Sequence, residues 1–238
     1  MTVAAAARVL RPLWLGTVPY CEAWQLQREL AAARSAGALG DDVVLLLEHP
    51  PVYTMGRSGE ARHLGAGPGA LIAAGAEYVD VDRGGSVTFH GPGQLVAYPI
   101  IKLADVFPVE GEPGIGDVLR YMRALEEAII ATAARCGLTV GRRPPYTGVW
   151  TGTAKLAAIG VKLASGVTTH GLALNVCTDL TWFERVTPCG IEGASATSLI
   201  ALGARPMTPA DVAPMLADAL AQAFGSALGE PLPMPAAA

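Results

Sequence analysis

The sequence predicts an α/β (α+β) fold, with a mixed central sheet flanked by helices. Segments with strand character outnumber those with helical periodicity, and the two kinds do not alternate regularly along the chain. Two of the strand-like segments are separated only by Ala164-Ser165-Gly166, a short turn typical of an antiparallel hairpin. A strictly alternating parallel sheet has no such hairpin, so a mixed sheet is expected.

Apolar residues recur every three or four positions in three segments, which are therefore expected to be helices. These segments are residues 21–34, 117–134 and 208–224. The third helix has a local start signal. Thr208 can cap its first turn, Pro209 suits the first helical position, and Asp211 can complete a capping box.

Apolar runs and alternating patterns predict the strands. The expected strands are residues 43–47, 78–82, 87–90, 95–101, 155–163 and 167–176. The first is continuously apolar, which favours a strand buried on both faces. Residues 65–75 and 108–116 are rich in glycine or proline and are expected to be surface loops, and residues 231–238 a frayed tail.

The composition excludes several classes of protein. Of the 238 residues, 51% are hydrophobic and 16% charged, so the chain is globular rather than disordered. The formal net charge of −4 argues against nucleic acid as the main partner. No stretch approaches the ~20 apolar residues of a membrane span, and the first residues lack the order of a signal peptide. We expect a cytoplasmic protein without a membrane partner.

The cysteines indicate reduced thiols. The four of them, Cys21, Cys136, Cys177 and Cys189, are widely spaced and form no C-x-x-C pair, so neither a zinc site nor a disulfide framework is expected. Cys189 stands out because Pro188 and Gly190 flank it, which favours an accessible turn. A thiol there could act as a nucleophile that forms thioesters, although a single cysteine is as often a small buried residue. The other three are interpreted as structural.

Lys155 begins an otherwise apolar strand. An amine near a thiol can exchange a proton with it and stabilise the thiolate, whereas the alternative is a surface lysine at a strand edge. Lys155 is also close in sequence to Arg142, Arg143 and Lys162. These four charges could form a docking site for an acidic carrier protein, but ordinary solvated charges explain them equally well.

Two histidines compete with Lys155 as the base. His90 and His170 each precede a glycine, and either could activate a thiol or fix a loop by hydrogen bonding. His90 belongs to the glycine-rich segment 83–94, whose backbone could surround a linear ligand while Val87 and Phe89 line an apolar wall. The segment is neither a G-x-x-x-x-G-K-[ST] nor a helix-opening G-x-G-x-x-G motif, so no nucleotide is indicated.

Together, several motifs of this chain resemble those of the lipoyl(octanoyl) transferases. The matching motifs are R-G-G-x-x-T-x-H-G-P-G-Q at 83–94, G-V-W at 148–150, K-x-A-A-I-G at 155–160, H-G-x-A-L-N at 170–175, P-C-G-I at 188–191 and T-S-L at 197–199. Phe89 stands where a tyrosine or tryptophan is more usual. The resemblance implies a biotin/lipoate protein ligase-like fold, with residues 1–238 as a single catalytic domain and a core at about 14–220.

The resemblance also implies an activity and a site. The family moves an octanoyl group from acyl carrier protein to a lysine of the lipoyl domains of 2-oxoacid dehydrogenases and of the glycine cleavage H protein, without cofactor or metal. By motif position, Cys189 is the thioester nucleophile and Lys155 the residue that favours its thiolate form. The implied substrate-contacting residues are Arg83, Gly84, Gly85, Ser86, Val87, Thr88, Phe89, His90, Ala158, Ile159, Gly160, Gly171, Leu172 and Ala173.

Backbone N–H groups near Gly190 and in the turn from His90 to Gly93 are the expected oxyanion donors. Three alternatives remain at this point. An ATP-dependent lipoate or biotin ligase of the same fold would need an adenylate-holding loop and no nucleophilic cysteine. A non-catalytic lipoyl-domain binding module would carry no acyl group, and a cysteine hydrolase that uses His90 or His170 would release free octanoate.

Overall fold

The computed structural model describes residues 8–187 and 193–232, so Pro188, Cys189, Gly190 and Ile191 lie outside the described residues. The helices are α1 (Tyr20–Ser35), α2 (Pro68–Ala73), α3 (Leu103–Val106), α4 (Val118–Arg135) and α5 (Pro209–Phe224), with 3-10 turns η1 (Ala61–Leu64) and η2 (Leu180–Arg185). The strands are β1 (Val9–Thr17), β2 (Asp42–Glu48), β3 (Val52–Met55), β4 (Glu77–Asp80), β5 (Val87–His90), β6 (Gln94–Ile100), β7 (Pro108–Val109), β8 (Glu112–Gly116), β9 (Gly141–Arg143), β10 (Tyr146–Thr151), β11 (Ala154–Ala164), β12 (Val167–Asn175), β13 (Ser195–Ala196) and β14 (Ala227–Leu228).

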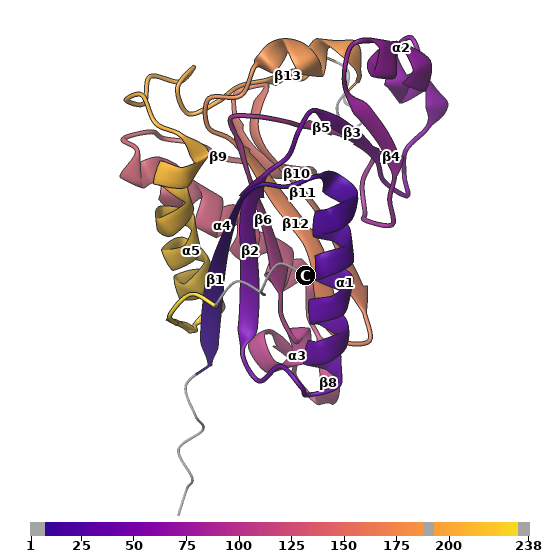
Figure 1. Ribbon diagram of the computed structural model, residues 1–238. Helices are drawn as coiled ribbons and strands as arrows, with labels where there is room; N and C mark the ends of the chain where they lie inside the picture. The colour runs from indigo at the N-terminus through magenta and orange to yellow at the C-terminus, as the bar shows by residue number, and fades with distance from the viewer. Residues whose placement is uncertain (1–7, 188–192, 233–238) are drawn as a thin grey trace, which may run out of the picture.

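The main sheet has the order β14-β1-β2-β6-β12-β11-β10-β9, with β13 added to β11. β1 runs parallel to both of its neighbours, whereas β2, β6, β12, β11, β10 and β9 pair antiparallel in succession. Helix α1 covers one face of this sheet, and α4 and α5 cover the other (Figure 1). The mixed sheet between helices confirms the predicted fold class.

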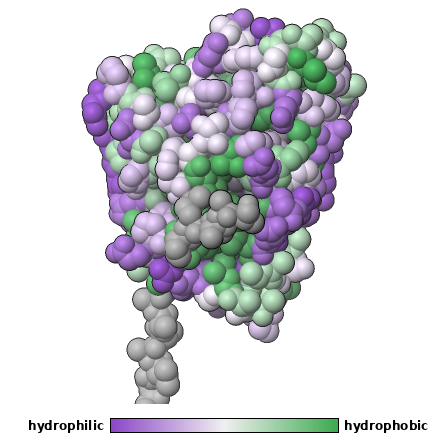
Figure 2. Space-filling model, in the orientation of Figure 1, coloured by the Kyte–Doolittle hydropathy of each residue, from purple (hydrophilic) through white to green (hydrophobic). Residues whose placement is uncertain are grey.

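Strand β2 shows how both faces of the sheet are buried. Val44 and Leu46 belong to the core beneath α4 and α5, whereas Val43, Leu45 and Leu47 belong to the core beneath α1. This confirms the expectation drawn from the apolar run. The core beneath α1 also includes partly exposed apolar side chains, and Figure 2 shows hydrophobic surface between α1 and β1 on that face.

A second, small sheet has the order β4-β3-β5 and lies with α2 beyond one end of the main sheet (Figure 1). β3 pairs parallel with β4 and antiparallel with β5. Its apolar cluster joins β3 and β5 to residues of η2, including Phe183. The two sheets thus place β5, which carries the middle of the glycine-rich segment, beside β11 and β12.

The predicted helices are confirmed at 20–35, 118–135 and 209–224. The start of α5 has the expected geometry. The backbone N–H of Thr208 donates to the Asp211 carboxylate (2.8 Å), and the Asp211 N–H donates to the Thr208 hydroxyl (3.3 Å). The hairpin of β11 and β12 is also confirmed, with Ala164 opposite Val167.

Two expected loops were wrong. Residues 65–75 contain α2, which starts with Pro68 after Gly67 and buries Leu71 against the small sheet. Residues 108–116 form the β7–β8 hairpin, in which Val109 pairs with Glu112. Their proline and glycine contents indicated breaks in structure, but these residues mark the helix start and the hairpin turn instead. The main sheet extends beyond the expected core at 14–220, because β1 starts at Val9 and β14 ends at Leu228.

The described part of the chain has no helix long and apolar enough to cross a membrane.

Candidate functional site

Most of the expected substrate-contacting residues line one pocket, which we call the motif pocket. It lies where β5 and the loop before it meet β11 and β12. Its lining residues are Tyr20, Arg83, Gly85, Ser86, Val87, Thr88, His90, Tyr98, Ala158, Ile159, Gly160, His170, Gly171, Leu172 and Ala173. Strand register explains the convergence, because Ala158 pairs with Ala173 and Gly160 with Gly171.

Gly84 and Phe89 do not line the motif pocket. The N–H of Gly84 donates to the carbonyl of Val161 (3.0 Å), which ties the glycine-rich loop to β11. Phe89 is fully buried on the opposite face of β5, stacked on Trp182 at 5.1 Å between ring centroids. Side chains alternate along a strand, so Thr88 and His90 face the pocket, whereas the Phe89 ring packs in the apolar cluster of the small sheet. The expectation that Phe89 lines an apolar ligand wall was therefore wrong.

Arg83 holds the glycine-rich loop in place. Its side chain is 7% exposed. One terminal nitrogen donates to the carbonyls of Gly84 and Ser86 (both 3.0 Å), and the other to the carbonyl (2.8 Å) and hydroxyl (2.7 Å) of Thr54 in β3. The arginine thus fixes the loop against the small sheet at the pocket wall.

The end of the motif pocket that lies towards α1 is lined by aromatic polar side chains. The Tyr20 hydroxyl lies 3.3 Å from Nδ1 of His170, and Nε2 of His170 lies 2.9 Å from the Asp82 carboxylate. The Tyr98 hydroxyl lies 2.8 Å from Nε2 of His49. Because Nδ1 of His49 contacts the Val18 carbonyl (2.7 Å), which can only accept, Nδ1 carries the proton and Nε2 accepts from Tyr98.

Burial keeps the histidines of this region neutral. It lowers the pKa of His49 to about 4 and holds the pKa of His90 well below its usual value, where the nearby His49 and Arg83 act in the same direction. Burial also lowers the pKa of His170, although the Asp82 carboxylate opposes this. The histidines at this end of the pocket are therefore neutral and hydrogen-bonded, and an uncharged part of a ligand can lie against them.

His90 and His170 are both engaged by other side chains. His90 Nδ1 lies 2.7 Å from the amide oxygen of Gln94, and His170 bonds Asp82 as described. His170 has a φ of 56°, and its backbone N–H donates to the amide oxygen of Gln27 (2.7 Å). These contacts favour the interpretation in which the histidines fix local geometry. His49 belongs to the same region and was not among the expected site residues.

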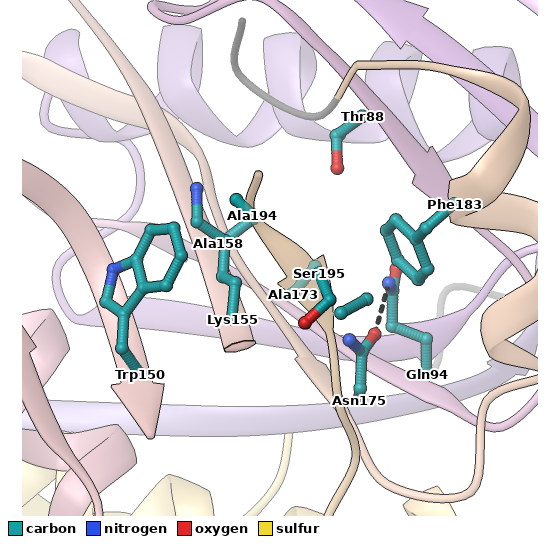
Figure 3. Close-up of a pocket in the computed structure, with 11 residues that line it drawn as sticks. Thr88, Gln94, Trp150, Lys155, Ala158, Ala173, Asn175, Phe183, Ala194 and Ser195 are labelled. Carbon is teal, nitrogen blue, oxygen red and sulfur yellow. Dashed lines mark hydrogen bonds between the residues drawn. The ribbon is translucent and has the colours of Figure 1, made fainter. Parts of the chain in front are cut away.

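A second pocket, the lysine pocket, adjoins the motif pocket. Its lining residues are Thr88, Gln94, Trp150, Lys155, Ala158, Ala173, Asn175, Phe183, Ala194, Ser195 and Ala196. Thr88, Ala158 and Ala173 line both pockets. Figure 3 shows Trp150 and Lys155 on one side and Phe183 and Gln94 on the other.

Lys155 is 9% exposed, and its ammonium nitrogen lies 4.7 Å from the centroid of the Trp150 ring. The strand that carries it is held on both sides. Trp150 pairs with Lys155 in β10, and Ala196 of β13 pairs with it on the other edge. The lysine is therefore an ordered, largely buried side chain of the pocket wall, not the solvated strand-edge lysine of the alternative interpretation.

Gln94 and Asn175, the last residues of two motifs, form a contact that the sequence did not predict. The Gln94 amide nitrogen donates to the Asn175 side-chain oxygen (2.9 Å), and the Asn175 amide nitrogen donates to the Thr197 carbonyl (2.9 Å; Figure 3 shows the first bond). Each of them ends one of the motifs that carry the family resemblance, and this is the only signal that the sequence offered. The contact holds β6, β12 and the segment before Ser198 around the lysine pocket.

The structure bears on three further interpretations of the sequence. The basic group of Arg142, Arg143, Lys155 and Lys162 is not one patch, because Arg142 pairs with Glu126 (2.8 Å) and Lys162 with Asp82 (2.5 Å) in different regions. In the expected oxyanion turn, the Gly93 N–H donates instead to the Glu48 carboxylate (2.7 Å).

The third interpretation concerns the cysteines that were expected to be structural. Cys21 and Cys177 are exposed rather than buried, and Cys136 is partly buried. Desolvation by neighbouring groups, with the nearby Glu48, raises the pKa of Cys177, which disfavours its thiolate.

Comparisons with known proteins identify the family. Residues 19–221 match the lipoyl protein ligase A/B catalytic domain. An octanoyltransferase of Rubrobacter xylanophilus is 53% identical over 186 residues, 77% of this chain and 79% of that protein. An octanoyltransferase of Chloroflexus aurantiacus is 50% identical over 221 residues, 91% of this chain and 95% of that protein.

Solved structures show the same fold. A putative lipoate protein ligase of T. acidophilum with bound lipoic acid has a TM-score of 0.68 at 14% identity, over 94% of this chain and 89% of that chain. Lipoate-protein ligase A bound with ATP has a TM-score of 0.66 at 15% identity, with the same coverage. The ligase-like fold that the resemblance implied is confirmed, and the chain belongs to the lipoyl protein ligase A/B catalytic domain family.

Proposed function

We propose that this protein is an octanoyltransferase. It moves an octanoyl group from the thioester of acyl carrier protein to a lysine of a lipoyl domain in 2-oxoacid dehydrogenases or the glycine cleavage H protein. The acyl group is carried on Cys189, and residues 1–238 act as one catalytic domain. The relatives that are 50–53% identical and are named octanoyltransferases support the activity.

The observation that carries the proposal is that the two pockets adjoin and share part of their walls. Thr88, Ala158 and Ala173 line both of them, so an acyl chain in the motif pocket would have its carboxyl end directed towards Lys155. Leu172 and Ile159 supply apolar surface along the motif pocket, and its histidines are neutral, while the Arg83 guanidinium is hydrogen-bonded to backbone carbonyls and to Thr54. An uncharged, linear chain suits this lining better than a phosphate or a sugar does.

In the first step, the Cys189 sulfur attacks the carbonyl carbon of the carrier thioester. Lys155 accepts the thiol proton and returns it to the pantetheine sulfur as the carrier leaves. One thioester bond forms and another breaks, so the step is nearly isoenergetic and needs no ATP.

In the second step, the acceptor lysine attacks the acyl-Cys189 carbonyl. Lys155 takes a proton from the attacking amine, and the Cys189 sulfur leaves and is reprotonated. A thioester is replaced by a more stable amide, which drives the transfer forward. A general base typically contributes about 10²–10⁴-fold to such a step.

Transfer without ATP tests the proposal. The protein is incubated with octanoyl-acyl carrier protein and a lipoyl domain, and the mass of the lipoyl domain is followed. We expect octanoylation of the domain without nucleotide. Octanoylation only from free octanoate with ATP would instead identify a ligase, release of free octanoate a hydrolase, and binding without any transfer a non-catalytic module.

A further inference from the structure

The strand pair that carries Lys155 is irregular at that residue. Val149 of β10 pairs with Ala157, but the next residue, Trp150, pairs with Lys155, so Leu156 has no opposite residue. This is the arrangement of a β-bulge, in which an extra residue bends one strand and redirects its side chains. The direction of the Lys155 side chain therefore depends on the bulge.

Gly148 lies directly before the bulge. Its φ is 110°, and a Cβ atom there would lie 2.5 Å from the Ala157 carbonyl oxygen and 3.7 Å from Cε of Lys155. A side chain at this position would therefore meet the Lys155 side chain, so Gly148 lies close to the lysine. The Gly148 N–H donates to the Oε1 atom of Glu126 in α4 (3.1 Å).

Glu126 joins three elements through one buried carboxylate. The side chain is fully buried. While Oε1 accepts from Gly148, Oε2 accepts from Arg123 in α4 (2.6 Å) and Arg142 in β9 (2.8 Å). Burying a carboxylate costs free energy unless it is paired and hydrogen-bonded, and here both oxygens are satisfied. The contacts to Gly148 and Arg142 tie α4 to the β9–β10 edge of the sheet, and Arg123 completes the pairing within α4.

We infer that Glu126 is a positioning residue for Lys155, acting through Gly148 and the bulge. The inference rests on the proposed function, because it assigns Glu126 to the placement of the proposed base. Glu126 does not line either pocket, so its effect reaches the reaction only through the lysine. A displaced base loses rate steeply, since a misplacement of about 1 Å costs on the order of 10²-fold.

The test compares Glu126→Gln with Glu127→Gln. The glutamine keeps an oxygen for the Gly148 N–H but turns an N–H donor towards two arginine donors, so the carboxylate contacts are lost. Glu127 is the matched control. It is the next residue, it also pairs with Arg142 (2.9 Å), and its side chain is 59% exposed. An exposed pair of this kind contributes little to stability.

The readout is the rate at which iodoacetamide alkylates Cys189, followed over pH by peptide mass spectrometry. Trypsin cleavage after Lys162 and Arg185 separates Cys177 from Cys189, so the exposed Cys21 and Cys177 serve as internal references. We expect Glu126→Gln to slow alkylation of Cys189 at neutral pH by roughly 10-fold or more and to move its profile to higher pH. Glu127→Gln and both reference cysteines should keep the wild-type profile.

Combination with Lys155→Met separates positioning from general damage. If Glu126 acts through Lys155, the double variant alkylates no more slowly than Lys155→Met alone. Two results overturn the inference and leave the proposed function intact. In the first, the double variant alkylates more slowly than Lys155→Met alone. In the second, Lys155→Met is slow but Glu126→Gln has the same pH profile as Glu127→Gln. A wild-type profile for Lys155→Met contradicts the proposed base and the inference with it.

Arg142→Gln repeats the test if Glu126→Gln does not fold. The Arg142 side chain is 35% exposed, and its substitution removes only one of the three contacts of the Glu126 carboxylate. A smaller shift in the same direction, absent in the Lys155→Met background, supports the inference. An unchanged profile overturns it.

Discussion

The Lys155 ammonium nitrogen lies 4.7 Å from the centroid of the Trp150 ring, and the two residues are paired across β10 and β11. The ring face attracts the cation and limits its rotamers. Trp150 is 3% exposed, so the pair is largely shielded from water. The tryptophan of the G-V-W motif thereby gains a specific role beside the proposed base.

Replacement of Trp150 by leucine should lower the rate of octanoyl transfer. A desolvated cation–π contact is worth up to about 2 kcal/mol, which corresponds to roughly 30-fold in rate. Trp150→Phe keeps an aromatic face and should lose less. Steady-state transfer rates, measured on variants with equal urea midpoints, check this. Equal rates for the leucine and phenylalanine variants would argue against the role.

Closing the junction of the two pockets should block the acyl chain but not a small reagent. Ala158 lines both pockets, and Ala158→Leu places three more carbon atoms there. We expect acyl loading from the carrier to fall at least 10-fold, while iodoacetamide still reaches Cys189 at the wild-type rate. Equal acyl loading of the wild type and Ala158→Leu would show that the acyl chain does not pass the junction of the two pockets.

Gly171 requires its lack of a side chain. A Cβ atom there would overlap the Ala97 carbonyl oxygen and lie 2.8 Å from Cδ of Pro99, both in the central strand β6. Gly171→Ala should therefore lower the free energy of unfolding by about 3 kcal/mol, the upper range for overpacking. Urea unfolding measures this. Gly69→Ala, at a glycine in α2 with no neighbouring atom within 4 Å, is the control and should change little.

Acid should destabilise the fold through the buried histidines. The pKa of His49 is about 4 in the native state, below the ordinary value of about 6.5 in the unfolded chain. Between these two values the unfolded state binds more protons, so the free energy of unfolding falls as pH decreases from about 6.5 towards 4. The slope is at most about 1.4 kcal/mol per pH unit for each such histidine.

Urea titrations at several pH values, for the wild type and His49→Gln, measure this dependence. The variant loses one group that titrates in the window, so its slope should be shallower. The same slope in both proteins would contradict the assignment of His49 as a neutral native histidine.

Local chemistry explains which elements the sequence predicted. The start of α5 was recognisable because Thr208 and Asp211 cap it within one turn, and β2 because its apolar run is buried by helices on both faces. β1 was missed because Arg11 and Pro12 interrupt its apolar pattern. Its pairing with β2 and β14 is a property of the whole sheet.

The site was predicted unevenly for the same reason. Lys155 and most of the motif residues meet at two adjoining pockets, because the motifs lie on neighbouring strands. Glu126 was missed because it stands beside Glu127 in α4, and its partner Gly148 is 22 residues away. Only the packing of α4 on the sheet distinguishes the buried glutamate from the exposed one.

The most direct test of the account is the location of the acyl group. The wild type is incubated with octanoyl-acyl carrier protein without an acceptor, digested with trypsin, and each cysteine peptide is weighed. We expect an octanoyl adduct on the peptide that follows Arg185, which contains Cys189, and none in Cys189→Ala. An adduct on the Cys21 or Cys177 peptide, or on the Cys189→Ala protein, would contradict the central claim.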